Sequence, residues 1–245
     1  MRAALGVCGR SWVVVAALVA SPVSLADAAL TLSGLAVNDP PARDVVERYT
    51  VARNLPPVRF VGTVEVTDWL LDRPGLAATL ARHLHPPLER YHIAMRDDGS
   101  FDVNDFGALR GNFRLVAQGM NRRVYFCQGQ FRSLAHLLTL SGGMVFGLEY
   151  RDARQGADPA VEVTPQLYVR LDNRLAHGVL KAIAPLLHGV IDRRVANLTA
   201  ATQIVGERIT RDPESLYREM KMWKDVGPED LEAYRQAFLA ERGTR

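Results

Sequence analysis

The sequence predicts an α+β fold in which the strands are gathered ahead of a long helix. Residues 91–171 contain many short runs in which apolar and polar side chains alternate, which is the period of strands with one buried face. From Arg174 to Ile209 the apolar side chains recur every three or four residues, as in a helix that lies on a sheet. Strands in one stretch and helices in others are typical of α+β proteins.

The composition excludes several classes of protein. The chain has 245 residues, of which 48% are hydrophobic and 23% charged, so it has enough apolar material for a sizeable core. Its 19 glycines and 13 prolines are ordinary globular usage, which excludes collagen-like or linker-like chains. The formal net charge is only +3, whereas nucleic-acid-binding proteins are usually more basic. We therefore expect no nucleic-acid partner.

Residues 1–28 have the pattern of a secretory signal peptide. Arg2 and Arg10 precede an apolar run from Trp12 to Ala20, and small residues follow. The run is shorter than the roughly 20 residues needed to span a bilayer. We expect cleavage, a mature chain that begins near Asp27 or Ala29, and a periplasmic or secreted location.

The N-terminal part of the mature chain, residues 29–57, is expected to form a helical strap. Its helix runs from Ala42 to Val51, because Asp39 and two prolines supply a start signal and Asn54 follows as an end signal. The first strand is expected at Val58–Val66, where apolar and polar side chains alternate.

Two short helices with a sharp elbow follow the first strand. Thr67 or Asp68 is expected to cap the helical segment Trp69–Leu71. The sequence Arg73-Pro74-Gly75 breaks it before a second helix over Leu76–Leu84.

The central region predicts an antiparallel sheet. Asp98-Gly99 supplies the positive backbone angles of a tight hairpin between its first two strands. In its last strand the apolar residues share one face, opposite a polar face that includes Tyr168, and Pro165 indicates an edge or a bulge. The expected strands are Tyr91–Met95, Phe101–Val103, Asn112–Gln118, Val124–Phe131, Met144–Tyr150 and Val161–Leu171.

The last third of the chain is expected to be helical. The long helix carries an apolar stripe from Leu187 to Ile209, with Pro185 as a kink or break upstream. Residues 211–245 follow as a charged helical C-terminal extension, with helices over Pro213–Lys224 and Glu229–Glu241. Because charged residues are frequent there, we expect a solvated appendage.

The order of elements resembles the START and Bet v 1-like superfamily, which includes bacterial polyketide cyclase/dehydrase and lipid-transport members. The resemblance covers residues 58–210 and is carried by the strand Arg59–Val66, the elbow helices Asp68–Leu84, and the helix segments Ile191–Val195 and Gly206–Ile209. It implies a helix-grip fold, in which a curved antiparallel sheet wraps around a long C-terminal helix. It also implies an apolar cavity between them that holds hydrophobic molecules.

Apolar side chains of the strands and of the long helix are the candidates for binding such a ligand. Glycines beside Met144 and Phe146 leave room in this region, and methionine adapts to irregular shapes. The alternative is that each candidate simply fills a core. The candidates are Phe113, Leu115, Met144, Phe146, Leu148, Leu167, Val169, Leu187, Ile191 and Leu198.

Motifs for cofactors, metals and nucleophiles are missing from the sequence. It has no phosphate-binding glycine loop, no H-E-x-x-H and no G-x-S-x-G, so no cofactor, metal or catalytic residue is assigned. His83, His85 and His92 do not converge from one regular element, and Asp97–Asp102 lacks the glutamate of a calcium loop. Cys127, the one cysteine left after signal removal, lies in an apolar stretch and is expected in the core or the cavity wall.

We interpret the chain as an exported carrier for a lipid or sterol, with a hydrophobic small molecule as its partner and transient membrane contact. One alternative is a cyclase or aromatase in the same cavity, using a histidine with Tyr91, Tyr125 or Arg114 as helpers. Another is an adaptor module that acts through the strap and the extension. The candidate histidines are His136, His177 and His188.

Arginines are concentrated in the strand region. Strand arginines that alternate with apolar residues usually form a solvated face, but at a cavity mouth they bind an anionic head group. They are Arg110, Arg114, Arg122, Arg123 and Arg132, with Arg193 and Arg194 on the long helix.

Overall fold

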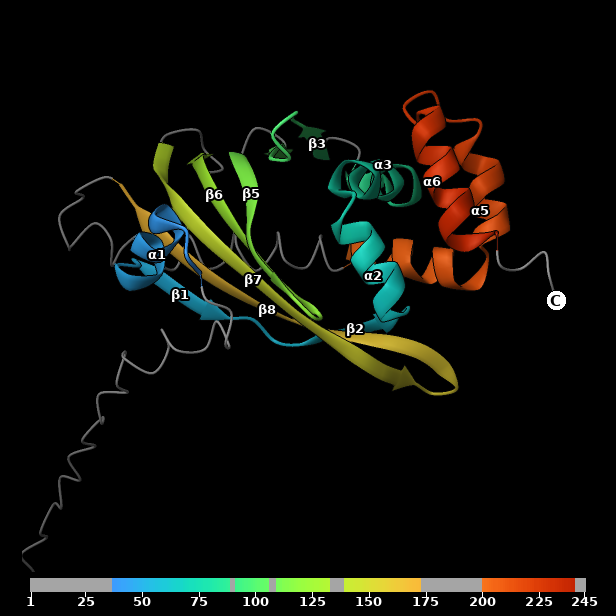
Figure 1. Ribbon diagram of the computed structural model, residues 1–245, viewed down its shortest axis with the longest axis horizontal. Coiled ribbons are helices and arrows are strands. Elements are labelled where there is room, and N and C mark those ends of the chain that lie inside the picture. Colours follow the sequence, from blue (N-terminus) through green and yellow to red (C-terminus); the bar gives the residue numbers. More distant parts are fainter. Residues whose placement is uncertain (1–36, 89–90, 106–108, 133–138, 173–199, 241–245) are drawn as a thin grey trace, which may run out of the picture.

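The computed structural model describes residues 37–88, 91–105, 109–132, 139–172 and 200–240 (Figure 1). Helices and strands are segregated, as the α+β prediction requires. The helices are α1 (Pro40–Glu47), α2 (Val64–Leu71), α3 (Pro74–Leu84), the 3-10 helix η2 (Pro86–Leu88), helical residues 200–211, α5 (Pro213–Met220) and α6 (Pro228–Phe238). The strands are β1 (Val51–Asn54), β2 (Val58–Val61), β3 (Tyr91–Met95), β4 (Phe101–Asp105), β5 (Leu109–Gly119), β6 (Arg122–Arg132), β7 (Thr139–Gln155) and β8 (Asp158–Leu171).

The eight strands form one antiparallel sheet, which is curved (Figure 1). Its order is β1-β8-β7-β6-β5-β4-β3, and β2 also pairs with β8. The β3–β4 hairpin turns at Gly99, whose φ is +78°, as Asp98-Gly99 predicted. The strands from β3 to β8 lie where the sequence placed them, and most extend further at their ends.

The strap adds a strand to this sheet. The expected helix over Ala42–Val51 ends at Glu47, and Val51 begins β1, which pairs with β8. Helix α1 packs on the outer face of the sheet, where Val45 and Tyr168 are buried in the same cluster. Tyr168 was expected on a polar face, and that expectation is wrong because α1 covers it.

The expected strand over Val58–Val66 is only half correct. Strand β2 ends at Val61, and Thr63 begins helix α2 by accepting a hydrogen bond from the backbone N–H of Val66 (3.3 Å). Threonine is a good N-cap because its oxygen satisfies an otherwise unpaired N–H of the first turn. This cap, rather than the alternating pattern, decides the structure at Val64.

Pro165 does not lie on an edge strand, but it does face an irregularity in the neighbouring strand, because residues 55–57 lie opposite residues 164–165 between the β1 and β2 pairings. It faces Leu148 within the continuous β7–β8 register, and its carbonyl accepts from the N–H of Leu55 (3.0 Å). In an extended residue the N and C=O point to the same side, so the missing N–H faces the interruption between β1 and β2. The proline therefore removes no hydrogen bond from the sheet.

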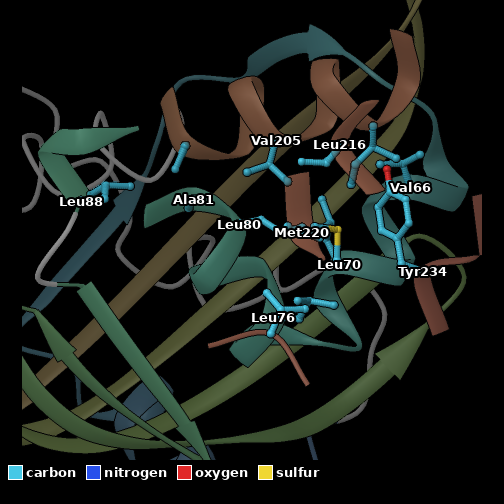
Figure 2. Close-up of a cluster of buried hydrophobic side chains, with 13 residues drawn as sticks. Val66, Leu70, Leu76, Leu80, Ala81, Leu88, Val205, Leu216, Met220 and Tyr234 are labelled. Atoms are coloured by element: carbon cyan, nitrogen blue, oxygen red, sulfur yellow. The ribbon is translucent and has the colours of Figure 1, made fainter. Parts of the chain in front are cut away.

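A second hydrophobic core lies among the helices at one end of the sheet (Figure 2). Helices α2 and α3 contribute Leu70 and Leu80, and the C-terminal helices contribute Leu216, Met220 and Tyr234. The last three side chains are fully buried. The expectation of a solvated extension is thus wrong, because apolar side chains of α5, of α6 and of the loop between them pack in this core.

Helical residues 200–211 join this core to the sheet. Ala201, Val205 and Ile209 are buried against the helices, and Gly206 lies against the ring of Phe60. The stripe upstream of residue 200, with Pro185, lies outside the described residues.

Candidate ligand-binding cavity

A cavity of about 450 Å³ lies between the concave face of the sheet and the helices. Helices α2 and α3 and residues 200–211 form one wall, and strands β3 to β8 form the other. Cavities of roughly 300–1,000 Å³ are the size that binds small molecules. The described lining is mainly aliphatic and aromatic and contains no charged side chain.

Six of the ten candidate residues line this cavity. Of the other four, Leu115 precedes a register shift between β5 and β6, is 42% exposed, and does not contribute to the lining. The bend of such a shift carries the strand away from the concave wall. Leu187, Ile191 and Leu198 lie outside the described residues. The six lining candidates are Phe113, Met144, Phe146, Leu148, Leu167 and Val169.

The helical elbow supplies lining residues that the strand-based candidates missed. Leu70 and Leu71 of α2 and Ala77, Ala78 and Ala81 of α3 face the cavity. The small side chains of α3 keep the helix close to the sheet while leaving internal space. The signal was present in the sequence, because these residues recur at helical spacing on one face.

The end of the cavity beside α2 carries two phenolic hydroxyls. Tyr125 of β6 and Tyr150 of β7 both line the cavity. Tyr125 donates to the carbonyl of Leu71 over 3.4 Å, and Tyr150 donates to the carboxylate of Asp68. Burial raises the pKa of Tyr125 to about 12, and burial with the Asp68 contact raises the pKa of Tyr150 further. Both hydroxyls therefore keep their protons at neutral pH.

Behind these tyrosines lies a buried arginine. Arg123 is 4% exposed, and its Nη2 donates to Asp68 Oδ1 (2.8 Å) and to Asp72 Oδ1 (3.4 Å). Its Nη1 donates to the carbonyls of Gly119 (3.3 Å) and Arg122 (3.1 Å). The expectation of a solvated face is wrong for Arg123, because two carboxylates of α2 and its C-cap provide partners for the buried charge.

Other arginines of the strand region lie away from the cavity. Arg114 pairs with Asp39 ahead of α1, with Nη2 2.8 Å from Oδ1, and Arg122 pairs with Glu149 (3.3 Å). The side-chain hydrogen bond from Arg114 lowers the pKa of Asp39. Arg110 and Arg132 are exposed. Arg193 and Arg194 lie outside the described residues.

The cavity wall includes the thiol of Cys127, as expected. Cys127 is 2% exposed and packs with Phe113 and Tyr125. Burial raises the pKa of its thiol to about 12, so the thiolate is not populated at neutral pH.

The polar residues proposed to assist a catalytic histidine do not all lie at the cavity. Tyr91 and Tyr125 line the cavity, but Arg114 lies on the outer face with Asp39. The candidate histidines His136, His177 and His188 lie outside the described residues. No group of three or more possible metal ligands occurs among the residues that the structure describes.

His83 has a packing role on the helical core. Its ring stacks on Trp223 with centroids 4.0 Å apart, and Nε2 lies 2.8 Å from Asp225 Oδ1. Arg82 donates to the same carboxylate (2.9 Å). These contacts attach the loop between α5 and α6 to α3.

Within the described ranges, none of the helices has the length and apolar character needed to cross a bilayer.

Solved structures similar to this chain include three of low identity. A START superfamily protein from Mycobacterium smegmatis is 11% identical over 65% of this chain and 98% of its own, with a TM-score of 0.39. Norcoclaurine synthase from Thalictrum flavum is 16% identical over 66% and 88%, with a TM-score of 0.40. A conserved protein from Geobacillus kaustophilus is 12% identical over 60% and 90%, with a TM-score of 0.38.

No protein-family model and no curated protein sequence matches this chain. The topology of the described residues is a curved antiparallel sheet with an elbow of two helices, α2 and α3, after β2. The described residues have the α+β architecture expected of a helix-grip fold, a curved antiparallel sheet with helices on its concave side.

Proposed function

We propose that this protein binds a hydrophobic small molecule in the cavity between its sheet and its helices. The carrying observation is a space of about 450 Å³ with an apolar described lining. Water inside such a space has few hydrogen-bond partners, so its replacement by an apolar guest is favourable. Elements from both layers of the fold line this space.

We further propose that the ligand is a lipid or sterol and that the protein is an exported carrier working in the periplasm or outside the cell. The support for export is the order of residues 1–28, where two arginines, a short apolar run and small residues follow one another. A lipid that leaves a membrane needs an apolar site for its chain, since the chain is otherwise exposed to water.

The cavity favours a carrier over the two alternatives. An adaptor needs no internal space, because its interfaces lie on the surface. A cyclase or aromatase needs a general base at the ligand, and the described lining offers tyrosine hydroxyls without histidine or carboxylate.

Ligand binding is tested by displacement and by mass. The full chain, purified gently, is expected to carry lipid masses in native mass spectrometry and to bind the neutral dye N-phenyl-1-naphthylamine saturably. Val169→Phe puts bulk into the cavity and should weaken dye binding at least about fivefold, whereas Thr164→Phe on the outer face of the same strand should not. A wild-type chain that carries no lipid and binds no dye contradicts the proposal.

Export is tested separately. Residues 1–28 fused to a phosphatase that is active only outside the cytoplasm should give activity, and Leu18→Arg in the apolar run should abolish it. The N-terminus of the mature product is expected near Asp27 or Ala29. An inactive fusion, or a Leu18→Arg fusion as active as the original, overturns export while leaving the cavity proposal intact.

A further inference from the structure

We propose that the ligand is uncharged and carries a hydroxyl group that lies against Tyr125, at the end of the cavity beside α2. This inference rests on the proposed function and adds the chemical class and the orientation of the ligand. It follows from which groups line the cavity and which of their hydrogen bonds are already made.

The charge of the ligand is argued from the lining. A carboxylate or phosphate placed in the cavity gives up its water and needs a cation or several donors in return. In the described lining no lysine, arginine or histidine is present, and the polar side chains are Thr67, Gln130, Thr202, Cys127 and three tyrosines. An anionic head group therefore has no charged partner among these residues, whereas a neutral ligand needs none.

The guanidinium nearest to the tyrosines does not change this conclusion. Arg123 lies behind Tyr125 and Tyr150 and outside the lining. Its two terminal nitrogens already donate to two carboxylates and two backbone carbonyls. If the Arg123 side chain turned toward an anionic ligand, Asp68 would lose its cationic partner. The new ion pair with the ligand would not compensate for this loss.

The hydroxyl is argued from the hydrogen-bonding capacity of the two phenols. Tyr150 donates its only hydroxyl hydrogen to Asp68, so its oxygen can only accept a hydrogen bond from a ligand. Tyr125 donates to Leu71 over 3.4 Å, a long bond for a hydroxyl, and its oxygen also retains acceptor capacity. A ligand hydroxyl both donates and accepts, and it therefore matches both phenols.

The opposite end of the cavity favours the apolar part of the ligand. It is formed by Leu140, Leu171 and the backbone of Gly142 and Gly143, and the exposed side chain of Gln130 also lines it. The glycines contribute backbone whose polar groups are engaged in the β7–β8 and β6–β7 ladders. The cavity thus has one end with phenols and one without, which orients an amphipathic guest.

Three probes of equal chain length test the inference by displacement of N-phenyl-1-naphthylamine from the full chain at pH 8. They are 1-dodecanol, which is neutral with a donor, dodecyl methyl ether, which is neutral without one, and dodecanoate, which is anionic. The alcohol should bind most tightly and the ether about two- to tenfold more weakly, the effect of one hydrogen bond. Dodecanoate should bind at least about a hundredfold more weakly.

Tyr125→Phe locates the hydroxyl. The variant should lose about two- to tenfold in affinity for 1-dodecanol and should no longer distinguish it from the ether. Tyr49→Phe is the matched control, since Tyr49 packs against Tyr168 on the outer face of the sheet. Its affinities should equal those of the wild type.

The outcomes separate this inference from the proposed function. If dodecanoate binds the wild type as tightly as 1-dodecanol, the neutral class is wrong although a hydrophobic site exists. If alcohol and ether bind equally to the wild type and to Tyr125→Phe, the placement of the hydroxyl is wrong. If neither the dye nor any of the three probes binds the wild type, the proposed function itself fails.

Discussion

Asp68 of α2 joins two strands to the helix that borders the cavity. Nη2 of Arg123 in β6 lies 2.8 Å from Oδ1 of Asp68. Tyr150 of β7 donates to the same carboxylate oxygen. One acidic side chain therefore attaches α2 to neighbouring strands at the end of the cavity. The Arg123 side chain is 5% exposed, whereas those of Asp68 and Asp72 are 34% and 50% exposed, so salt screens this attachment only in part.

Replacing Arg123 with methionine should destabilise the protein by about 2–4 kcal/mol, because it removes a buried cation from two carboxylates and two carbonyls. The free energy of unfolding in urea measures it. Arg43→Met is the control, since Arg43 pairs with Glu47 on the exposed face of α1 and should leave the midpoint nearly unchanged. Equal midpoints for Arg123→Met and the wild type would show that the network adds no stability.

The sequence predicts those parts of the fold that local chemistry determines. Asp98-Gly99 correctly places the β3–β4 hairpin, because a positive φ is needed there and glycine permits it. At Val64 two local signals compete, the alternation of a strand and the cap of Thr63, and only the second is satisfied by a hydrogen bond. The partners of Arg123 could not be predicted, because Asp68 is 55 residues away and meets it only in the folded sheet.

The C-terminal helices should prove integral to the domain. Met220 of α5 is fully buried, and Met220→Ala should cost about 2–5 kcal/mol in unfolding free energy by leaving a cavity in the helical core. Met222, two residues further on, is 73% exposed, so Met222→Ala should be close to neutral. Urea titrations of the two variants at one pH compare them directly. An unfolding free energy unchanged by Met220→Ala would support a solvated extension instead.

Residues 211–245 show that the composition of a short segment does not predict whether that segment is buried. Charged residues dominate residues 211–245, yet one apolar side chain per turn is enough to bury a helix when its positions align. The lining residues of the cavity were likewise predicted only in part. Strand alternation indicates which side chains of β7 and β8 face inward, but whether a helix fills the space above them depends on packing between distant segments.

Gly143 should be required for the contact between α1 and the sheet. A Cβ at this position would lie 2.6 Å from Cγ2 of Val45, so Gly143→Ala should push α1 outward and cost about 1–3 kcal/mol. Val45→Ala removes the clashing methyl and should rescue much of that loss in the double variant, which a double-mutant cycle measures. Gly227→Ala, with nothing closer than 3.9 Å, is the control. Additive effects of Gly143→Ala and Val45→Ala would contradict the contact.

Cys127 should make stability fall at high pH. Burial raises the pKa of its thiol to about 12, whereas its ordinary value is near 9. Below pH 9 the thiol is protonated in both states, so its contribution is constant. Between pH 9 and 12 the unfolded chain loses the proton that the folded chain keeps, which favours unfolding by up to about 1.4 kcal/mol per pH unit.

The test compares urea unfolding of the wild type and Cys127→Ala at pH 8, 9 and 10. The variant has a smaller side chain and should be less stable at pH 8. Its stability should decline less steeply above pH 9, because only the tyrosines and the lysines still titrate there. A disulfide reagent adds a second readout, since the native thiol should react far more slowly than the unfolded one at pH 8. Parallel pH slopes for the two proteins, together with rapid native labelling, would mean that the thiol is open to water and that the cavity wall at Cys127 is not closed.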